Sequence, residues 1–392
     1  MRSVLGTKDC YGCGVCAASC TRNAISMKLG YTGFWEPEIH GETCIHCGVC
    51  ADVCSFRSDD VERDGSSDVR CFAGWSLDSG NRNACSSGGV AFEIARYLMK
   101  KDYGALVCRY NSPERQAEHY LAKTEEELKP SIGSKYLQSN SYPGFSQLRK
   151  EGKYLVAGTP CQIDSVRRWV KKQKMEERVV VLDFFCHGVP SMLMWDKYCS
   201  EVENKIGKID QIAWRDKSQG WHDSWVMKAG DRYASKYSDG DLFYRMFLKN
   251  RCLAEACYEK CKFKGLASAA DIRVGDLWGS KFLRNDEGVS GVVGLTRKGL
   301  DLLGMMDSVL HLEPSTAEIV CESQMKKCAP RPISYGYVLR SLPSKKTMAE
   351  IDRIASFLEQ FEEIPRTMRY YAFRFPKKVK ELLHGRVLRV KP

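Results

Sequence analysis

The sequence predicts an α+β chain, in which a small cysteine-rich N-terminal domain (residues 1–60) precedes a larger α/β domain with a mixed sheet. Three observations support this prediction. A run of four cysteines recurs once within the first sixty residues. Beyond residue 70, short apolar segments alternate with helical patterns, as in sheets whose parallel strands are joined by helices. The 392 residues, 43% of them hydrophobic, are enough for two or three domains with their own cores.

The repeated cysteine run has the spacing C-x2-C-x2-C-x3-C, which is typical of bacterial two-cluster ferredoxins. It comprises Cys10, Cys13, Cys16 and Cys20, and again Cys44, Cys47, Cys50 and Cys54. In such proteins three thiolates hold one [4Fe–4S] cluster and the fourth reaches across to the other. The predicted ligand sets are therefore Cys10, Cys13, Cys16 and Cys54 for the first cluster, and Cys44, Cys47, Cys50 and Cys20 for the second. Nearby glycines are predicted to allow tight turns that present N–H groups to the sulfurs, namely Gly12, Gly14 and Gly48.

A structural zinc site or a disulfide scaffold fits the 19 cysteines less well. Structural zinc usually takes two separated CxxC pairs rather than crowded triplets. A disulfide scaffold needs an oxidising compartment, and Met1 to Asp9 has no apolar stretch of a secretory signal, so we expect a cytoplasmic protein. The longest strongly apolar run, Val179 to Phe185, is too short to span a bilayer.

The formal charge of +11 does not indicate nucleic-acid binding, because it is concentrated at one end. Residues 366–391 hold five Arg, four Lys and one Glu, which leaves the rest nearly neutral. We expect residues 331–392 to form a basic helical extension. This tail either docks on an acidic partner or an anionic membrane surface, or simply completes the fold as a solvated helix.

The larger domain, residues 61–330, is predicted from its strand and helix patterns. Ser58 to Asp68 is expected to be a linker, and Gly88-Gly89 to open a helix. Strands are expected at residues 105–110, 154–157 and 179–185, the last two each followed by a Gly/Pro turn and a helix. The Trp- and Tyr-rich segment from Ile209 to Ser238 favours antiparallel strands.

Two of these turns carry cysteines. In Gly158 to Gln162, Thr159 is predicted to be a helix N-cap with Pro160 at the first helical position, and Cys186 to Pro190 follows a strand in the same way. Such turns lie at the carboxyl edge of a sheet, where ligands bind. A cysteine at a helix N-terminus is biased toward the thiolate that binds iron.

Two further cysteines are spaced i, i+4 and would share one helix face. Together with the turn cysteines they are predicted to hold a third [4Fe–4S] cluster, with the ligands Cys161, Cys186, Cys257 and Cys261. The alternative is that these are buried structural thiols. That structural role is the prediction for Cys71, Cys85, Cys108, Cys199, Cys252, Cys321 and Cys328. His187 is a weak candidate for proton transfer, since adjacent residues on an extended turn seldom form a catalytic Cys–His pair.

A protein that joins one-electron clusters to hydride donors commonly uses a flavin. No GxGxxG fingerprint follows a strand and no P-loop motif is present, so a Rossmann site is not predicted. The segment Ser86-Ser87-Gly88-Gly89 at a helix start is a candidate for binding phosphate through its N–H groups.

Several sequence blocks in order resemble the beta subunit family of coenzyme F420 hydrogenase/dehydrogenase. They span residues 70–300 and are Ser87-Gly88-Gly89, Gly133 to Ser139, Gly158 to Gln162, Phe185 to Pro190, Arg215-Asp216-Lys217 and Gly275 to Gly279. The resemblance implies a non-Rossmann, mixed-sheet domain that binds FAD beside a [4Fe–4S] cluster and exchanges hydride with a deazaflavin. The N-terminal cluster pair resembles the dehydrogenase-type members.

The family resemblance also implies residues for the flavin. The expected FAD contacts are Ser87, Gly88, Gly89, Ser134, Lys135, Tyr136, Gln138 and Thr159. Arg215 and Lys217 are expected to bind an acidic cofactor tail, and Asp276 or Trp278 to line the pocket. For each single residue, a surface charge or a core aromatic is the alternative.

The sequence thus predicts an iron–sulfur flavoprotein oxidoreductase. It would pass electrons between a hydride-carrying cofactor such as F420, or a small organic substrate, and ferredoxin or another redox protein. The alternative is a non-catalytic subunit that relays electrons through its clusters to a partner. A zinc-dependent structural or nucleic-acid-binding module is disfavoured by the triplet spacing.

Overall fold

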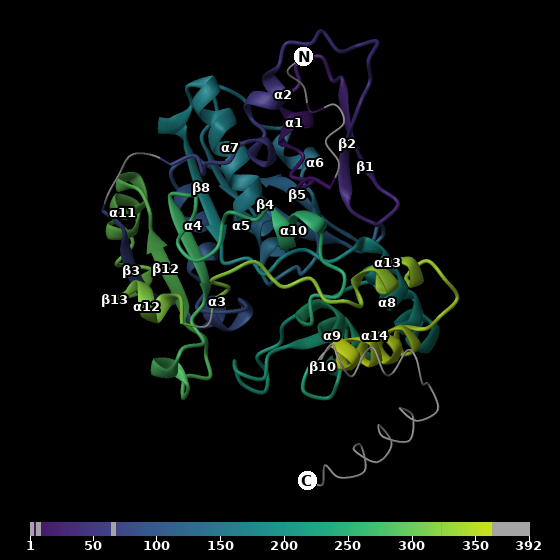
Figure 1. Ribbon diagram of the computed structural model, residues 1–392. Coiled ribbons are helices and arrows are strands. Elements are labelled where there is room, and N and C mark those ends of the chain that lie inside the picture. The colour runs from purple at the N-terminus through teal and green to yellow at the C-terminus, as the bar shows by residue number, and fades with distance from the viewer. Residues whose placement is uncertain (1–3, 5–8, 64–67, 323, 363–392) are drawn as a thin grey trace, which may run out of the picture.

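The computed structural model describes residues 4, 9–63, 68–322 and 324–362. A nine-stranded mixed sheet forms the centre of the molecule (Figure 1). Its strands run in the order β13 (Leu310–Ser315), β3 (Arg70–Ser76), β12 (Ser290–Gly294), β11 (Ile272–Asp276), β8 (Val179–Phe184), β7 (Tyr154–Ala157), β4 (Gly104–Asn111), β5 (Gln116–Ala122) and β6 (Ser139–Asn140).

The sheet combines both kinds of strand pairing. Strands β11, β8, β7 and β4 are mutually parallel, and β6 is parallel to β5. The pairs β11–β12, β12–β3, β3–β13 and β4–β5 are antiparallel. The predicted mixed sheet is therefore confirmed, and the expected strands at 105–110, 154–157 and 179–185 are all present within a residue or two at either end.

Each face of the sheet has its own cover. On one face Leu155, Val180 and Leu182 pack beneath α4 (Val90–Met99) and α11 (Arg297–Gly304). On the other face Val156 and Val181 pack beneath α7 (Pro160–Gln173). Val15 and Val53 of the N-terminal segment join this second core, so the cysteine-rich segment is attached to the α7 face.

The N-terminal segment contains two matching short helices and one hairpin. They are α1 (Val15–Ala18), α2 (Val49–Asp52), the antiparallel pair β1 (Ile25–Leu29) and β2 (Trp35–Ile39), and the 3-10 turn η1 (Ser55–Arg57). Gly14 and Gly48 begin the two helices with φ of 69° and 82°, in the left-handed region that favours glycine. The internal repeat in the sequence is thus a repeat of local structure.

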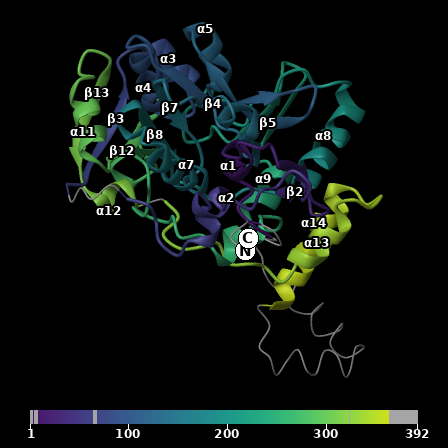
Figure 2. The same cartoon turned by 90° about the horizontal axis from the view of Figure 1, so that it is seen from above.

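A second lobe packs beside the sheet. It is built on large aromatic side chains such as Trp195, Trp214 and Phe243. Its elements are α8 (Met192–Ile206), β9 (Val226–Ala229), β10 (Tyr233–Lys236), α9 (Leu242–Leu248), α13 (Tyr335–Ser341) and α14 (Met348–Glu362). Helices α13 and α14 lie on the opposite side of the molecule from α11 and β13 (Figure 1, Figure 2).

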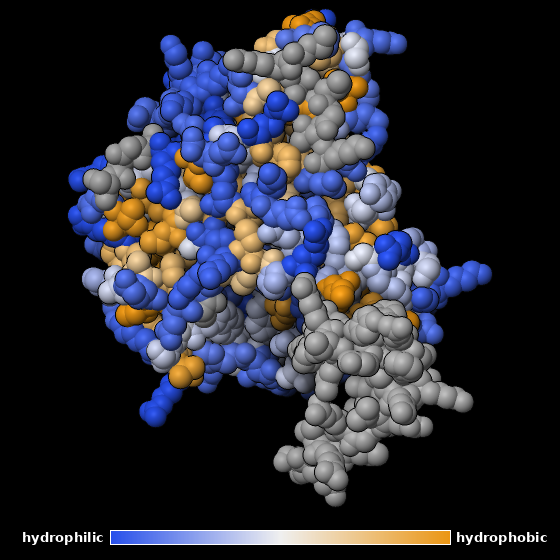
Figure 3. Space-filling model, viewed as in Figure 1, coloured by the Kyte–Doolittle hydropathy of each residue, from blue (hydrophilic) through white to orange (hydrophobic). Residues whose placement is uncertain are grey.

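Short elements complete the chain between these parts. They are α3 (Ser79–Ala84), α5 (Glu125–Leu128), η2 (Lys129–Ser131), α6 (Tyr142–Phe145), η3 (Glu176–Arg178), α10 (Glu255–Glu259), η4 (Ser280–Phe282) and α12 (Ala317–Val320). On the face shown in Figure 3, hydrophobic residues gather in several patches set among hydrophilic ones. In the described residues, no helix has both the length and the apolar character needed to cross a bilayer.

Three local predictions are corrected or narrowed by the structure. Helix α8 begins at Met192 with Ser191 as its N-cap, so Cys186 precedes it by six residues and is not at a helix N-terminus. In the segment 209–238 only β9 and β10 form antiparallel strands, and their hairpin is separate from the main sheet. The predicted linker is fastened to α7 through Asp60 and Glu62, while residues 64–67 lie outside the described part.

The structure describes only the first half of the predicted C-terminal extension. Helices α13 and α14 account for much of residues 331–362. The basic tail from Arg366 onward lies outside the described residues.

Candidate functional site

Two pockets in the N-terminal segment are each lined by four cysteines. The first also contains Val4, Met27, Pro37 and Phe56, and its cysteines are Cys10, Cys13, Cys16 and Cys54. The second also contains Ile25 and Ile39, and its cysteines are Cys20, Cys44, Cys47 and Cys50. The pockets enclose about 360 and about 420 Å³ of empty space, part of it open to solvent.

These two quartets are the sets predicted from the spacing, in which the fourth cysteine of each run crosses to the other cluster. Four thiols around an apolar pocket are the donor set of a [4Fe–4S] cluster, so the residues present fit that group. Within the described part of the chain, no three His, Cys, Asp or Glu side chains converge as ligands of a single metal ion do. The ligand assignment itself stays a prediction.

The local backbone supports the sulfurs. The N–H of Gly12 donates to Cys10 Sγ at 3.3 Å, and the N–H of Ala24 donates to Cys20 Sγ at 3.3 Å. Gly12 has a φ of 61°, and a Cβ there would lie 2.3 Å from both Trp35 O and Gln138 Nε2. Only glycine fits this turn, because the chain is pressed against the hairpin on one side and the body on the other.

Burial decides the charge state of these thiols. Burial raises the pKa of Cys10 to about 12 and that of Cys13 to about 11, and it also raises the pKa of Cys16. The unliganded thiols are therefore neutral at pH 7. Because a metal binds the thiolate, loading iron into the pocket must release these protons.

The four cysteines predicted for a third cluster come from distant parts of the chain and lie near one another. Burial raises the pKa of the Cys161 thiol, and the neighbouring Cys186, Cys13 and Cys257 raise it further. Cys257 is affected in the same way by burial and by Cys186 and Cys261. The helix N-terminus was expected to favour the thiolate form of Cys161. Burial favours the neutral thiol, and this effect is the larger one.

Two features bring these cysteines together. Helix α7 begins at Pro160 with Thr159 as its N-cap, as predicted, and this places Cys161 in the first turn. The second feature is a backbone hydrogen bond from Ala254 N–H to Val189 O. It joins the turn from Cys186 to Pro190 to the segment before α10. A Cβ on Gly188 would lie 3.4 Å from Cys257 Cβ, so the turn lies directly against that cysteine.

The third group adjoins the first pocket, with Tyr11 between them. Tyr11 follows Cys10 in the chain and lines the first pocket. Its ring packs edge-on against Phe56 and Phe263, and its hydroxyl donates to Lys260 O, next to Cys261. The thiols of Cys161 and Cys261 lie close enough to raise the pKa of the Tyr11 phenol, in addition to the larger effect of burial.

Sequence reasoning missed several residues near these cysteines. Tyr11 could have been noticed as the aromatic residue within the first motif. Ser165 lies one helical turn after Cys161, and its Oγ is 3.4 Å from Cys13 Sγ. Cys328, assigned a purely structural role, donates from Sγ to the carbonyl of Cys261 at 3.1 Å. Nothing in the spacing of Cys328 indicated that position.

The residues proposed for FAD fall into two groups in the structure. Ser134 donates from both its N–H and its hydroxyl to Ser86 Oγ, at 2.9 and 3.0 Å, which joins the two predicted loops. Lys217 Nζ donates to the carbonyls of Arg82 and Ser87, and so holds the same loop. Burial lowers the pKa values of Lys135 and Lys217 to about 8.

The second group is an aromatic cluster around Arg215. The guanidinium lies 4.9 Å from the ring centroids of both Trp225 and Trp278, and it pairs with Asp276 at 2.9 Å. It also donates to the hydroxyl of Tyr136, whose ring stacks on Trp225 with centroids 5.1 Å apart.

This aromatic cluster extends toward the third cysteine group. The ring of Phe247 lies 5.4 Å from Tyr136 and 4.9 Å from His187, measured between centroids. His187 follows Cys186, and burial lowers the pKa of its imidazole. A chain of rings therefore connects the two regions.

Two predicted FAD residues are engaged elsewhere. Gln138 accepts from Trp35 N–H at 2.7 Å and donates to Tyr11 O at 3.1 Å, so it fastens the N-terminal segment to the body. The Thr159 side chain lies 3.2 Å from Cys161 Sγ.

The two predicted glycines lie at the start of a helix, as expected. Gly88 and Gly89 begin α4, and Gly89 has the φ of 84° that favours glycine.

Two parts of the chain match known families. Residues 9–58 match the family described as 4Fe-4S dicluster domain. Residues 151–318 match the family described as the C terminus of the coenzyme F420 hydrogenase/dehydrogenase beta subunit. The resemblance from the sequence blocks is thus supported over its second half, while the Ser87 and Gly133–Ser139 blocks lie before the matched span.

Among solved structures, the chain is similar to a chain in the xenon-derivatised F420-reducing [NiFe] hydrogenase complex from Methanosarcina barkeri. The TM-score is 0.46 and the identity 16%, and the similarity covers 74% of this chain and 88% of that one. No curated protein matches the sequence. The chain is thus similar to a 4Fe–4S dicluster domain over residues 9–58 and to the C terminus of coenzyme F420 hydrogenase/dehydrogenase beta subunits over residues 151–318.

Proposed function

We propose that this chain is an iron–sulfur flavoprotein oxidoreductase. It passes electrons between a hydride-carrying cofactor of the F420 type, or a small organic substrate, and ferredoxin or another redox protein. The main support for the proposal is that three groups of four cysteines lie one beside the next in the molecule. The third group adjoins the first across Tyr11, and the first and second pockets share one small core that contains Cys16, Ile25 and Cys50.

The chain's own residues would hold the groups. Bound [4Fe–4S] clusters would carry single electrons, and a bound FAD would supply the exchange between hydride and single electrons. Cys10, Cys13, Cys16 and Cys54 hold the first cluster, and Cys20, Cys44, Cys47 and Cys50 the second. Cys161, Cys186, Cys257 and Cys261 hold the third. Tyr11 packs against residues of both the first and the third group.

The arrangement gives electron flow a physical order. Cys161 and the Arg215 cluster are on the body side, the first pocket is in the middle, and the second pocket reaches the surface. Cys47 is exposed and Ile45 is 61% exposed, whereas Cys16 is buried. The redox protein partner therefore meets the chain at the second pocket.

The flavin assignment is supported by the two groups of residues that the structure brings together. Ser134 and Lys217 contact the loop from Ser86 to Gly89, with Lys135 nearby, and the backbone N–H groups of this loop together with the two partly buried lysines suit phosphate. Tyr136, Asp276 and Trp278 lie next to them, with the ring chain to His187 leading to the third cysteines. Arg215 is a positioning residue here, because each of its nitrogens already donates to Ser224, Tyr136 or Asp276.

The test is metal and flavin analysis after anaerobic purification and reconstitution. About twelve iron atoms and one FAD per chain are expected. Cys161→Ala should lower the iron content to about eight, while Cys199→Ala, which removes a buried thiol in the second lobe, should leave it unchanged. An unchanged iron content in Cys161→Ala would refute the third cluster.

One observation favours the alternative function, a relay subunit without flavin. The ammonium group of Lys135 is already surrounded by four carbonyl oxygens, those of Pro130, Ser131, Ile132 and Gly133. For FAD to bind there, Lys135 would have to exchange these contacts for phosphate. A protein that holds iron and sulfide but takes up no flavin on reconstitution is this relay.

A further inference from the structure

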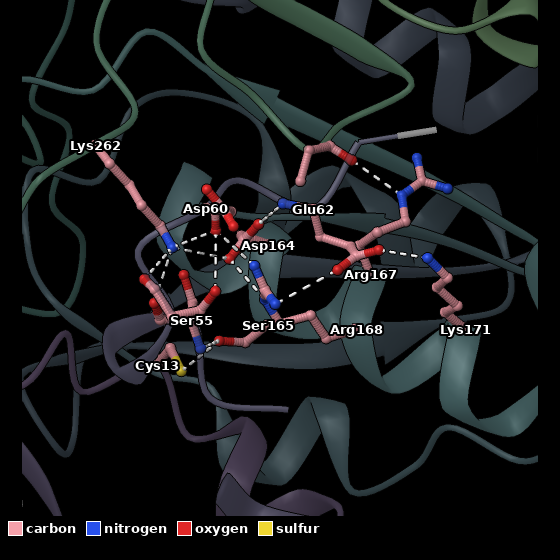
Figure 4. Close-up of polar contacts among 12 residues, drawn as sticks. Cys13, Ser55, Asp60, Glu62, Asp164, Ser165, Arg167, Arg168, Lys171 and Lys262 are labelled. Atoms are coloured by element: carbon pink, nitrogen blue, oxygen red, sulfur yellow. Dashed lines mark hydrogen bonds and ion pairs between the residues drawn. The ribbon is translucent and has the colours of Figure 1, made fainter. Parts of the chain in front are cut away.

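Ser165 makes a contact that links helix α7 to the first cysteine pocket. Its side chain is fully buried, and its Oγ lies 3.4 Å from Cys13 Sγ. The same Oγ accepts the N–H of Ser55 at 3.1 Å, and Ser55 follows Cys54, another cysteine of that pocket. Figure 4 shows Ser165 with both partners on one side of it.

The direction of the hydrogen bond follows from the chemistry of the ligand. In the free thiol, Cys13 has a proton and can donate to Ser165. As a cluster ligand Cys13 is a thiolate and has none, so the hydroxyl must be the donor. The Ser55 N–H already uses an acceptor site of this oxygen, which leaves the hydroxyl proton available for the sulfur.

The position of Ser165 relative to the segment after Cys54 is fixed by polar contacts around it. Asp164 accepts the N–H of Glu62 at 2.6 Å and pairs with Arg168 at 3.1 Å. Lys262 donates to the carbonyls of Ser55, Ser58 and Asp60 at 3.0, 2.7 and 2.6 Å. This network holds the segment that follows Cys54 against α7 (Figure 4). The hydroxyl therefore meets the sulfur in one preorganised geometry.

We propose that Ser165 is a positioning residue that raises the reduction potential of the cluster held by Cys10, Cys13, Cys16 and Cys54. A reduced cluster carries one more negative charge, and a hydrogen bond to its sulfur stabilises that charge. Cys161 lies one turn earlier on α7. The same helix would therefore hold a ligand of the third cluster and tune the reduction potential of the first. The inference rests on the proposed function, since it requires the clusters.

The experiment is a redox titration of the reconstituted full-length protein, followed by EPR spectroscopy. Ser165→Ala is expected to lower one midpoint potential by about 59 mV, which corresponds to a tenfold change in a one-electron equilibrium. Ser19→Ala is the matched control. Ser19 is buried near the same pocket, but its hydroxyl donates to the carbonyl of Cys16 rather than to a sulfur, so the potentials should not change.

A second pair of variants separates the hydroxyl from the shape of the side chain. Ser165→Thr keeps the hydroxyl and should retain the wild-type potential, whereas Ser165→Val has the same shape without it and should show the lowered potential. Equal potentials in these two variants, or in wild type and Ser165→Ala, would overturn the inference. A wild-type protein that takes up no cluster would instead overturn the proposed function.

Discussion

Arg215 lies in a buried cage in which each nitrogen of its guanidinium is engaged. Its side chain is 1% exposed and lies between Trp225 and Trp278. Ser224, Tyr136 and Asp276 accept its hydrogen bonds. An arginine used in this way fixes the surrounding rings and carboxylate, so its contribution is structural as well as electrostatic.

Replacing Arg215 by alanine should therefore be costly. The change leaves Asp276 without its partner and removes both ring contacts, and we expect a loss of about 3 kcal/mol in the free energy of unfolding. Anaerobic urea unfolding measures it. Arg297→Ala is the control, because Arg297 and Asp301 are 77% and 55% exposed and should contribute less than about 0.5 kcal/mol. Similar losses in both variants would contradict the cage.

His119 should make stability depend on pH. Burial lowers the pKa of this side chain from 6.5 to about 4, while one ring nitrogen bonds Ala157 O at 3.0 Å. Below pH 6.5 the unfolded chain binds a proton that folded His119 does not. The stability contributed by neutral His119 is present above pH 6.5 and is lost as the pH falls through 4, by about 3 kcal/mol.

The comparison of two variants tests this. In His119→Gln the unfolding free energy should fall less between pH 6.5 and 4 than in wild type. His40→Gln, which changes an exposed histidine, should keep the wild-type slope. If the two variants have the same slope, His119 is not the titrating group.

Helix α7 is the element that joins the two parts of the molecule. Its N-terminal turn contains Cys161, its middle contacts the first pocket through Ser165, and its apolar face covers the sheet through Ile163 and Val166. Its polar face holds the segment 55–62 through Asp164 and Arg168. Four tasks are thus arranged at helical spacing along fourteen residues.

Removing one of the cations at this junction should loosen it. Lys262→Met loses the hydrogen bonds to the carbonyls of Ser55, Ser58 and Asp60. We expect this variant to lose about 1.4 kcal/mol of local stability, so that amide hydrogen exchange across residues 55–62 becomes about tenfold faster. Mass spectrometry of peptides measures it. Lys281→Met, which breaks an exposed pair with Glu313, should leave this exchange unchanged. Unchanged exchange in Lys262→Met would show that the junction does not depend on this lysine.

At the scale of the whole molecule, exposure differs between the cysteine pockets. The second pocket is bordered by Cys47 and Ile45, which are exposed, whereas the first lies between the hairpin, η1 and α7. The third group lies beside α7 and α10, and its four cysteines are partly exposed. Because its border is exposed, the second pocket is the one that a reagent in the solvent reaches most directly.

The greater exposure of the second pocket predicts the order in which iron is lost. When the oxidised, reconstituted protein is treated with a chelator, about four iron atoms should leave in a fast phase, from the second pocket. Cys47→Ala should lack that phase, and Cys16→Ala should keep it. A fast phase that disappears in Cys16→Ala instead would place the exposed cluster at the first pocket.

The sequence was sufficient where the information is local. The spacing of the N-terminal cysteines predicted which four would surround each pocket, and Thr159 with Pro160 predicted the start of α7. It was insufficient where contacts join distant segments. Gln138 bridges Tyr11 and Trp35, and Arg215 is enclosed by Ser224, Tyr136 and Asp276, contacts that no local pattern indicated, while the FAD contacts expected of both residues stay predictions.

By itself, therefore, the sequence determined the two-part organisation, the mixed sheet and the cysteine repeat, because periodicity, capping and ligand spacing act over a few residues. Only the tertiary structure decided that the third cysteine group adjoins the first pocket across Tyr11, and that Ser165 reaches Cys13. Those contacts join residues more than a hundred positions apart, and packing of the N-terminal segment on α7 brings them together. No local pattern encodes such packing, since it depends on the shapes of two complete surfaces.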